Sequence, residues 1–244
     1  MISSQGKMLS LLFVLLSFLS VCVSGWTGFD GQDPYGRNMS LSWSIHFEPA
    51  VAGLNKRLEP RFEEFRDDLV NRATPVLQND EKFLAFGNDQ AMLGSDGFVG
   101  CIGAVIVSTK GTIIAHYSND PSGVERAKDK LPKLIKENKK ALAGGQAWIY
   151  AHVRPREPNN FLTAPGNQVL IDIIKRELDI DAHVERYAEI EDFLEKDNGE
   201  LREDFEELYD ELKQGAILVK HAGGPSEPAE VIFVNLDWQR PADD

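Results

Sequence analysis

The chain has 244 residues, with 26 Lys and Arg against 39 Asp and Glu and a formal net charge of −13. An acidic balance of this size argues against nucleic acid or an anionic membrane surface as the main partner. The length is sufficient for one domain with a sizeable hydrophobic core, preceded by a leader.

The N-terminus has the pattern of a secretory signal peptide. Lys7 precedes an apolar run at 8–19, and small residues follow up to Gly25. A membrane span needs about 20 predominantly apolar residues, and this run is shorter. We therefore expect residues 1–25 to be cleaved, with Cys22 or Ser24 as alternative ends of the segment, and the mature protein to be secreted and extracellular, without stable membrane association. A retained anchor is the alternative.

Residues 26–46 are rich in Gly and turn-forming residues, which predicts an irregular lead-in. They contain a glycosylation sequon at 38–40, and in an exported chain Asn38 is the predicted glycan site. The remaining stretch, 47–240, is expected to fold as a single α/β domain.

The first predicted elements are a helix and a hairpin. Apolar residues between 49 and 76 recur at three- and four-residue spacing, which predicts a helix that Pro60 kinks or splits. Residues 98–107 form a nearly continuous apolar run rich in β-branched side chains, which is typical of a buried strand. A turn at 108–111 and a strand at 112–117 complete the hairpin.

Helical and strand-like patterns then alternate to the end of the chain. In order they are a lysine-rich helix at 122–143, a strand at 146–153, a helix at 167–178, a half-exposed strand at 182–187, a mostly helical acidic segment at 190–213, and strands at 216–220 and 230–236. This order predicts an α+β fold with mixed and antiparallel β-sheet layers and flanking helices.

Cys101 becomes the only cysteine once a leader containing Cys22 is removed. An unpaired thiol in an oxidising compartment indicates a bridge to another chain, a buried inert side chain or a reactive nucleophile. The first option would give a disulfide-linked dimer through Cys101. A cysteine in an apolar strand is ordinarily a small buried hydrophobe, so the third option needs a chemical partner.

His116, fifteen residues downstream on the second strand of the hairpin, is the candidate partner. A two-residue loop would place it directly opposite Cys101, and a four-residue loop would place it diagonally; in both registers the side chains share a face. A three-residue loop would send them to opposite faces. The sequence leaves these registers open.

A cysteine and a histidine on one face can form a nucleophile and base pair. The imidazole is expected to lower the thiol pKa and later to protonate the leaving group. Gly100 and Gly103 would let a substrate backbone approach, and amides near Gly100 and Cys101 would stabilise an oxyanion. Four other histidines show no metal-ligand spacing and are assigned structural roles: His46, His152, His183 and His221.

The Gly100-Cys101 strand, the short turn and the strand ending in Ala115-His116 resemble the superfamily that unites cytotoxic necrotizing factor toxins with the bacterial chemotaxis receptor glutamine deamidase. The chain also looks like a group of secreted fungal proteins that have a Gly-Cys strand, a hairpin and a late pair of strands. The resemblance covers roughly residues 95–236, and its specific motif is the Cys/His pair.

The resemblance implies a deamidase-like fold and thiol-dependent deamidation of protein glutamine without a metal or an organic cofactor. Cys101 would be the nucleophile and His116 the base. The chemotaxis enzymes also use a Thr six residues before the cysteine, where this chain has Ser95. The implied partner is a protein substrate or host protein, as for a toxin or effector. The alternative is a non-catalytic secreted effector or protein-interaction domain that keeps the fold, with Cys101 buried.

Overall fold

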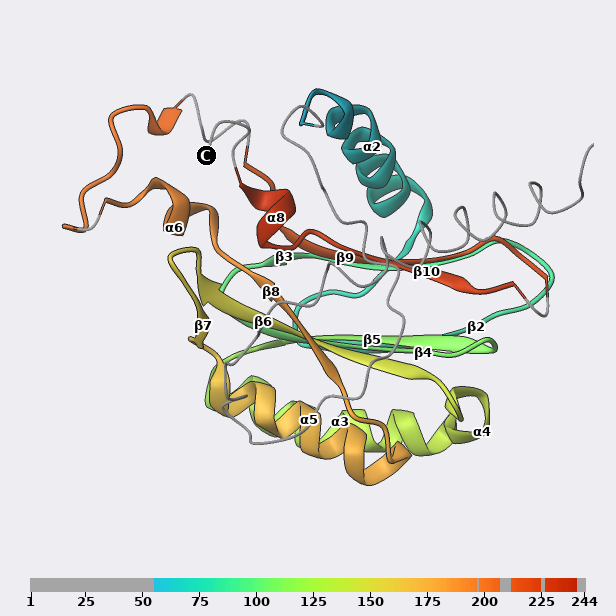
Figure 1. Ribbon diagram of the computed structural model, residues 1–244. Coiled ribbons are helices and arrows are strands. Elements are labelled where there is room, and N and C mark those ends of the chain that lie inside the picture. The colour runs from blue at the N-terminus through green and yellow to red at the C-terminus, as the bar shows by residue number, and fades with distance from the viewer. Residues whose placement is uncertain (1–54, 197, 207–211, 225–226, 241–244) are drawn as a thin grey trace, which may run out of the picture. The chain divides into compact units, whose positions relative to one another are not determined.

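Two β-sheets lie face to face, with helices on their outer sides, in the computed structural model, which describes residues 55–196, 198–206, 212–224 and 227–240 (Figure 1). These residues belong to the unit Pro49–Asp244, and its mixed helices and sheets confirm the α+β class. The predicted signal peptide, the lead-in, Asn38 and His46 lie outside the described residues. None of the described helices is long and apolar enough to cross a bilayer.

The larger sheet contains the predicted hairpin at its centre. Its strands, in spatial order, are β2 (Asp80–Ala85), β5 (Gly111–Ser118), β4 (Cys101–Val107), β6 (Gln146–Arg154) and β7 (Glu157–Phe161), and β8 (His183–Tyr187) also pairs with β6. All these pairs are antiparallel except β6 with β8, which are parallel.

The smaller sheet joins the middle of the chain to its C-terminal part. Its strands, in order, are β1 (Thr74–Pro75), β3 (Ala91–Phe98), β9 (Gly215–His221) and β10 (Ala229–Phe233). β1 runs parallel to β3, whereas β3 with β9 and β9 with β10 are antiparallel. The late pair of strands predicted from the sequence is therefore present.

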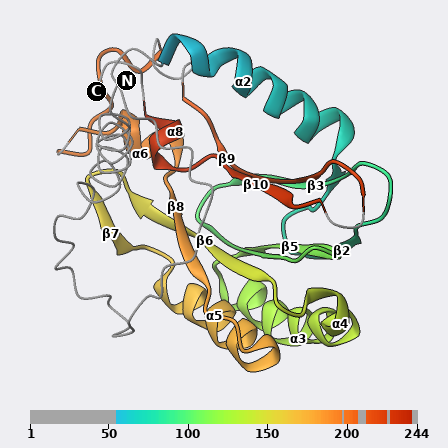
Figure 2. The same cartoon turned by 45° about the vertical axis from the view of Figure 1, so that its right-hand side comes forward.

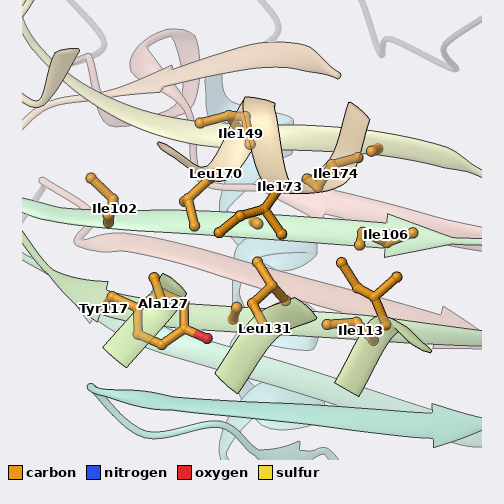
Figure 3. Close-up of a cluster of buried hydrophobic side chains, with 14 of the residues drawn as sticks. Ile102, Ile106, Ile113, Tyr117, Ala127, Leu131, Ile149, Leu170, Ile173 and Ile174 are labelled. Atoms are coloured by element: carbon orange, nitrogen blue, oxygen red, sulfur yellow. The ribbon is translucent and has the colours of Figure 1, made fainter. Parts of the chain in front are cut away.

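β4 is apolar along its whole length because both of its faces are buried. Ile102, Ala104 and Ile106 pack towards α3 (Pro121–Glu137) and α5 (Ala164–Leu178) (Figure 3). Cys101 and Val105 point to the opposite face, where they pack with residues of the smaller sheet. Figure 2 shows α3 and α5 on one side of the larger sheet and β3, β9 and β10 on its other side.

Short helices complete the unit. α4 (Lys139–Leu142) follows α3, α6 (Ile190–Leu194) follows β8, and α8 (Leu236–Gln239) follows β10. Asp120 is the N-cap residue of α3. Its side chain accepts hydrogen bonds from the backbone N–H groups of Ser122 and Gly123.

The outer face of the smaller sheet is covered by α2 (Asn55–Asp67) and the π-helical turn η1 (Asp68–Arg72). Gly94 on β3 permits this close packing, because a Cβ there would lie 2.5 Å from Leu69 Cδ1. Asp68, which is buried, forms ion pairs with Lys220 on β9 at 2.5 Å and with Arg72 at 2.7 Å. These contacts fix the helix to the sheet.

Three expectations about the elements were wrong. Pro60 does not split the first helix, because α2 runs through it to Asp67. The run at 98–107 is not one strand, because β3 ends at Phe98 and the chain turns at Gly100, whose φ is +63°, before β4 begins. The acidic segment from 190 is helical only in α6 and near 205–206 among its described residues.

The ion pair between Asp68 and Lys220 provides a test of how the helix is held. Burial alone raises the pKa of Asp68, but hydrogen bonds and charges from Lys220 and Arg72 outweigh it and hold this pKa below its usual range. Lys220→Met leaves the buried carboxylate with only Arg72, and we expect it to lower the free energy of unfolding by about 2 kcal/mol at pH 7.

Urea unfolding measures this loss, with Lys110→Met, an exposed lysine in the β4–β5 turn, as the control. The folded pKa of Asp68 is below its unfolded value. The stabilisation that ionised Asp68 provides is therefore fully present above its unfolded pKa. It disappears as pH falls through its folded pKa. Equal stabilities of Lys220→Met and wild type at pH 7 would contradict the role given to this pair.

Candidate functional site

A chain of two hydrogen bonds between the sheets holds His116. Ser95 Oγ donates to the Val76 carbonyl at 2.7 Å and lies 2.9 Å from His116 Nδ1. Ser95 comes from β3 in the smaller sheet and His116 from β5 in the larger one, and both are buried. The structure therefore brings together two of the three predicted site residues from different sheets.

These bonds determine which nitrogen of His116 carries the proton. A serine hydroxyl has one proton, and Ser95 gives it to the Val76 carbonyl, which can only accept. Ser95 Oγ must then accept from His116, so Nδ1 is protonated and Nε2 keeps its lone pair. Nε2 is buried and has no hydrogen-bond partner among the residues that the structure describes. A buried imidazole with a free lone pair has the form that a general base needs.

The surroundings of His116 keep its ring neutral. The ring is 1% exposed and stacks on Phe98, with the ring centroids 3.8 Å apart. Burial lowers the pKa of His116 to about 4. Phe98 also packs edge-on against Tyr150 and Tyr187, so an aromatic layer separates the imidazole from water.

Gly103 makes room for this stack. It lies directly opposite His116 in the β4–β5 ladder, and a Cβ at this position would be 2.8 Å from Phe98 Cε1. The prediction that Gly103 lets a substrate backbone approach was therefore wrong for this structure. The missing side chain is needed because the Phe98 ring occupies that space.

Cys101 is the first residue of β4, and its side chain is 2% exposed. Its thiol donates to the Val99 carbonyl at 3.4 Å, and its sulfur accepts a hydrogen bond from Gln78 Nε2 at 3.4 Å. Burial is the main cause that raises the pKa of the thiol. The charges of Glu189 and Asp120 raise it further, while the contacts with Val99 and Gln78 oppose the shift.

Cys101 and His116 share the inner face of the larger sheet. Val107 pairs with Thr112, which is the register of the four-residue loop, and Gly103 pairs with His116. Cys101 is therefore diagonal to His116, at a typical Cα separation of about 7–8 Å. No hydrogen bond joins them, because His116 Nε2 has no partner within the described part of the chain. The expectation that the imidazole lowers the thiol pKa was wrong for the resting protein, in which both groups are neutral.

A four-residue segment that sequence analysis did not select organises the site. Within 76–79, the Val76 carbonyl anchors Ser95 and the Gln78 amide contacts Cys101. Asn79 has a φ of +57°, and its Oδ1 accepts from the backbone N–H and the hydroxyl of Ser118 at the end of β5. The polar run Gln-Asn-Asp at 78–80 was the only available signal, and it indicates a turn rather than a site.

The other described histidines lie elsewhere. His152 Nε2 lies 3.0 Å from Asp192 Oδ2, His183 is near the ring of Trp148, and His221 stacks on Phe86. Among the residues that the structure describes, no group of three or more His, Cys, Asp or Glu could hold a metal ion. Because Cys101 is buried, a disulfide to a second chain would require its sulfur to leave this position.

The pH dependence of stability should report the buried state of His116. Its folded pKa, about 4, is below the ordinary 6.5, so the unfolded chain binds the proton more tightly. The free energy of unfolding is therefore unaffected by protonation of this histidine above pH 6.5. It falls as pH drops from 6.5 towards 4, by about 3 kcal/mol in total. Unfolding experiments across this range should therefore show a steeper loss for wild type than for His116→Gln. Parallel curves would contradict the burial of a neutral imidazole.

Gly103→Ala should disturb the stack on His116. The added methyl group has to displace the Phe98 ring, and overpacking of this kind costs about 1–3 kcal/mol. We expect lower stability in urea and an altered His116 titration by NMR. Gly87→Ala is the matched control, because a Cβ at Gly87 meets nothing within 4 Å. If both variants behave like wild type, the space above Gly103 is not required.

No family model matches the chain, and no curated protein matches its sequence. What the site can do therefore follows from its own geometry and chemistry.

Proposed function

We propose that this protein is a thiol-dependent amide hydrolase of the protein-glutamine deamidase type. Cys101 is the nucleophile, His116 is the base, and Ser95 is the residue that positions the base. The observation that carries the proposal is the lone pair of His116 Nε2, which is buried, unpartnered and on the same sheet face as the only described cysteine. His221 Nε2 is also buried without a hydrogen-bond partner among the described residues, so what sets His116 apart is that it shares a sheet face with Cys101. Buried polar atoms without partners are uncommon, and catalytic groups are one explanation for them.

The reaction begins with a proton transfer. Substrate entry turns the Cys101 S–H away from the Val99 carbonyl, and the proton passes to His116 Nε2. The sulfur attacks the side-chain carbonyl carbon of glutamine, a C–S bond forms, and the carbonyl electron pair moves to oxygen. When this adduct collapses, Nε2–H protonates the departing nitrogen, the C–N bond breaks, and ammonia leaves behind a thioester.

Water completes the cycle. His116 Nε2 takes a proton from water as its oxygen attacks the thioester carbon, and collapse of this second adduct breaks the C–S bond. The products are glutamate and the Cys101 thiol, which recovers the proton held by His116. Throughout, Ser95 holds Nδ1–H in place and stabilises the charged imidazolium, although burial opposes that charge.

The neutral resting pair favours this general-base route over a preformed thiolate–imidazolium pair. Burial raises the pKa of Cys101 and lowers that of His116, so both shifts oppose proton transfer until the substrate is bound. A secreted enzyme meets an oxidising environment. While Cys101 is buried and protonated, its thiol would react little with oxidants. Export of the mature chain remains part of the proposal.

Ammonia release from a blocked glutaminylglycine peptide tests the function. Cys101→Ala should abolish release, and His116→Gln should lower kcat by about 10²–10⁴-fold. Ser95→Ala should lower kcat about 10–100-fold, because the ring loses the contact that fixes its tautomer. Ser95→Thr keeps the hydroxyl and should restore most of the rate.

Circular dichroism and urea unfolding of each variant separate a catalytic loss from a loss of fold. Ammonia release that persists in folded Cys101→Ala would overturn the proposal. Absence of release from wild type with peptide and unfolded protein substrates would favour the alternative of a non-catalytic interaction domain.

A further inference from the structure

The side chain of Gln78, in the loop between β1 and β2, contacts the sulfur of Cys101. Its residue is exposed, while its Nε2 donates to a sulfur whose side chain is only 2% exposed. Two surface hollows of the described part of the chain, lined by Lys136–Ala141 and by Arg156–Asn160, contain neither Cys101 nor His116. A substrate that reaches the thiol therefore has to move the groups that cover it.

We propose that Gln78 has two roles in the proposed reaction: it covers Cys101 in the resting protein, and its side-chain amide then donates to the oxyanion of the thiol adduct. The inference rests on the proposed function, because an oxyanion forms only if Cys101 attacks a carbonyl. The chemical class of substrate is a flexible glutamine side chain that can enter where the Gln78 amide leaves the sulfur.

The position of the amide supports the second role. The oxyanion of a thiol adduct is two bonds from the sulfur, so a donor that already contacts the sulfur reaches this oxygen by a small movement of its side chain. A neutral amide N–H suits the task, since it stabilises developing negative charge without adding a titrating group. Burial and the charges of Glu189 and Asp120 raise the pKa of Cys101, whereas the hydrogen bond from Gln78 opposes them, so this amide already favours negative charge at the sulfur.

The backbone around Gln78 is held firmly enough to aim the amide. Val76, two residues earlier, accepts from Ser95 and donates its own N–H to the Gly94 carbonyl at 2.8 Å. Asn79, the next residue, is fixed to Ser118 by two hydrogen bonds of 3.0 Å. The Gln78 side chain is therefore the movable part of a fixed segment, which is what a cover and donor requires.

Two substitutions separate the two roles. Gln78→Ala removes both the cover and the donor, so folded protein should react with iodoacetamide at Cys101 several-fold faster, while kcat for ammonia release from glutaminylglycine falls about 10–100-fold. Gln78→Glu keeps the size of the side chain but cannot donate when ionised, so alkylation stays slow and kcat still falls. The control is Gln90→Ala. Gln90 is an exposed glutamine that directly precedes β3, and this variant should match wild type in both assays.

The two assays also distinguish failure of this inference from failure of the proposed function. If wild type releases ammonia and both Gln78 variants retain its kcat, Gln78 is not the donor, although the function stands. If alkylation of Gln78→Ala is no faster than that of wild type, Gln78 does not cover the thiol. If wild type releases no ammonia, the proposed function and the oxyanion role fall together, and the alkylation rates still decide the covering role.

Discussion

The hydrogen-bond chain from the Val76 carbonyl through Ser95 to His116 is the interaction on which the rest of the site depends. It places two polar side chains inside the apolar space between the sheets, where unpaired polar groups are costly. The chain gives the Ser95 hydroxyl one acceptor and one donor partner and satisfies His116 at Nδ1, and it leaves the lone pair at Nε2 without a partner among the described residues.

The packing around these hydrogen bonds explains why both Cys101 and His116 are neutral in the resting protein. Phe98 lies flat on His116, and Tyr150 and Tyr187 pack against Phe98, so water is kept from the imidazole. Tyr187 also donates its hydroxyl to the Cys101 carbonyl at 2.7 Å, which fixes the start of β4. In such surroundings charge separation is unfavourable until a substrate supplies compensating contacts. The fold therefore provides a positioned neutral imidazole and a covered thiol, rather than a preformed ion pair.

Carboxylates near the thiol act in the same direction. Glu189 Oε1 lies 3.1 Å from the position that a Cβ on Gly100 would occupy, and burial, as the largest cause, raises the pKa of Glu189. Asp120 caps α3, and its hydrogen bonds with Ser122 and Gly123 lower its pKa to about 2, so it is charged at neutral pH. Both negative charges disfavour a free Cys101 thiolate.

The sequence indicated the parts of the fold that have strong periodicity. The apolar hairpin, the strand at 146–153, the helix at 167–178 and the late strand pair were predicted because burial on one or both faces imposes a pattern on the residues. β2 and β3 were missed, since Asp80–Ala85 is half-buried and Ala91–Phe98 contains two glycines and an aspartate. Ser95 lies on β3, so its position beside His116 could be suggested by resemblance but not by local pattern.

Sequence analysis identified residues of the site more readily than it predicted their protonation states and hydrogen bonds. Cys101 and His116 were placed on one face in one of the registers considered, but their protonation depends on burial and on hydrogen bonds that cross between sheets. Gln78 and Val76 contribute through a loop, where no periodicity exists. Gly103 was noted beside the cysteine, but its function depends on the Phe98 ring, which approaches from the neighbouring strand.

The central claim is that His116 is held as the neutral tautomer with Nδ1 protonated and Nε2 free, and nitrogen NMR of the ring in the folded protein at pH 7 measures this directly. The account predicts a protonated, pyrrole-type Nδ1 and an unprotonated, pyridine-type Nε2 in wild type, with a mixture of tautomers in Ser95→Ala. A proton on Nε2 in wild type would contradict the account, because the site would then have no free base to accept the proton of Cys101.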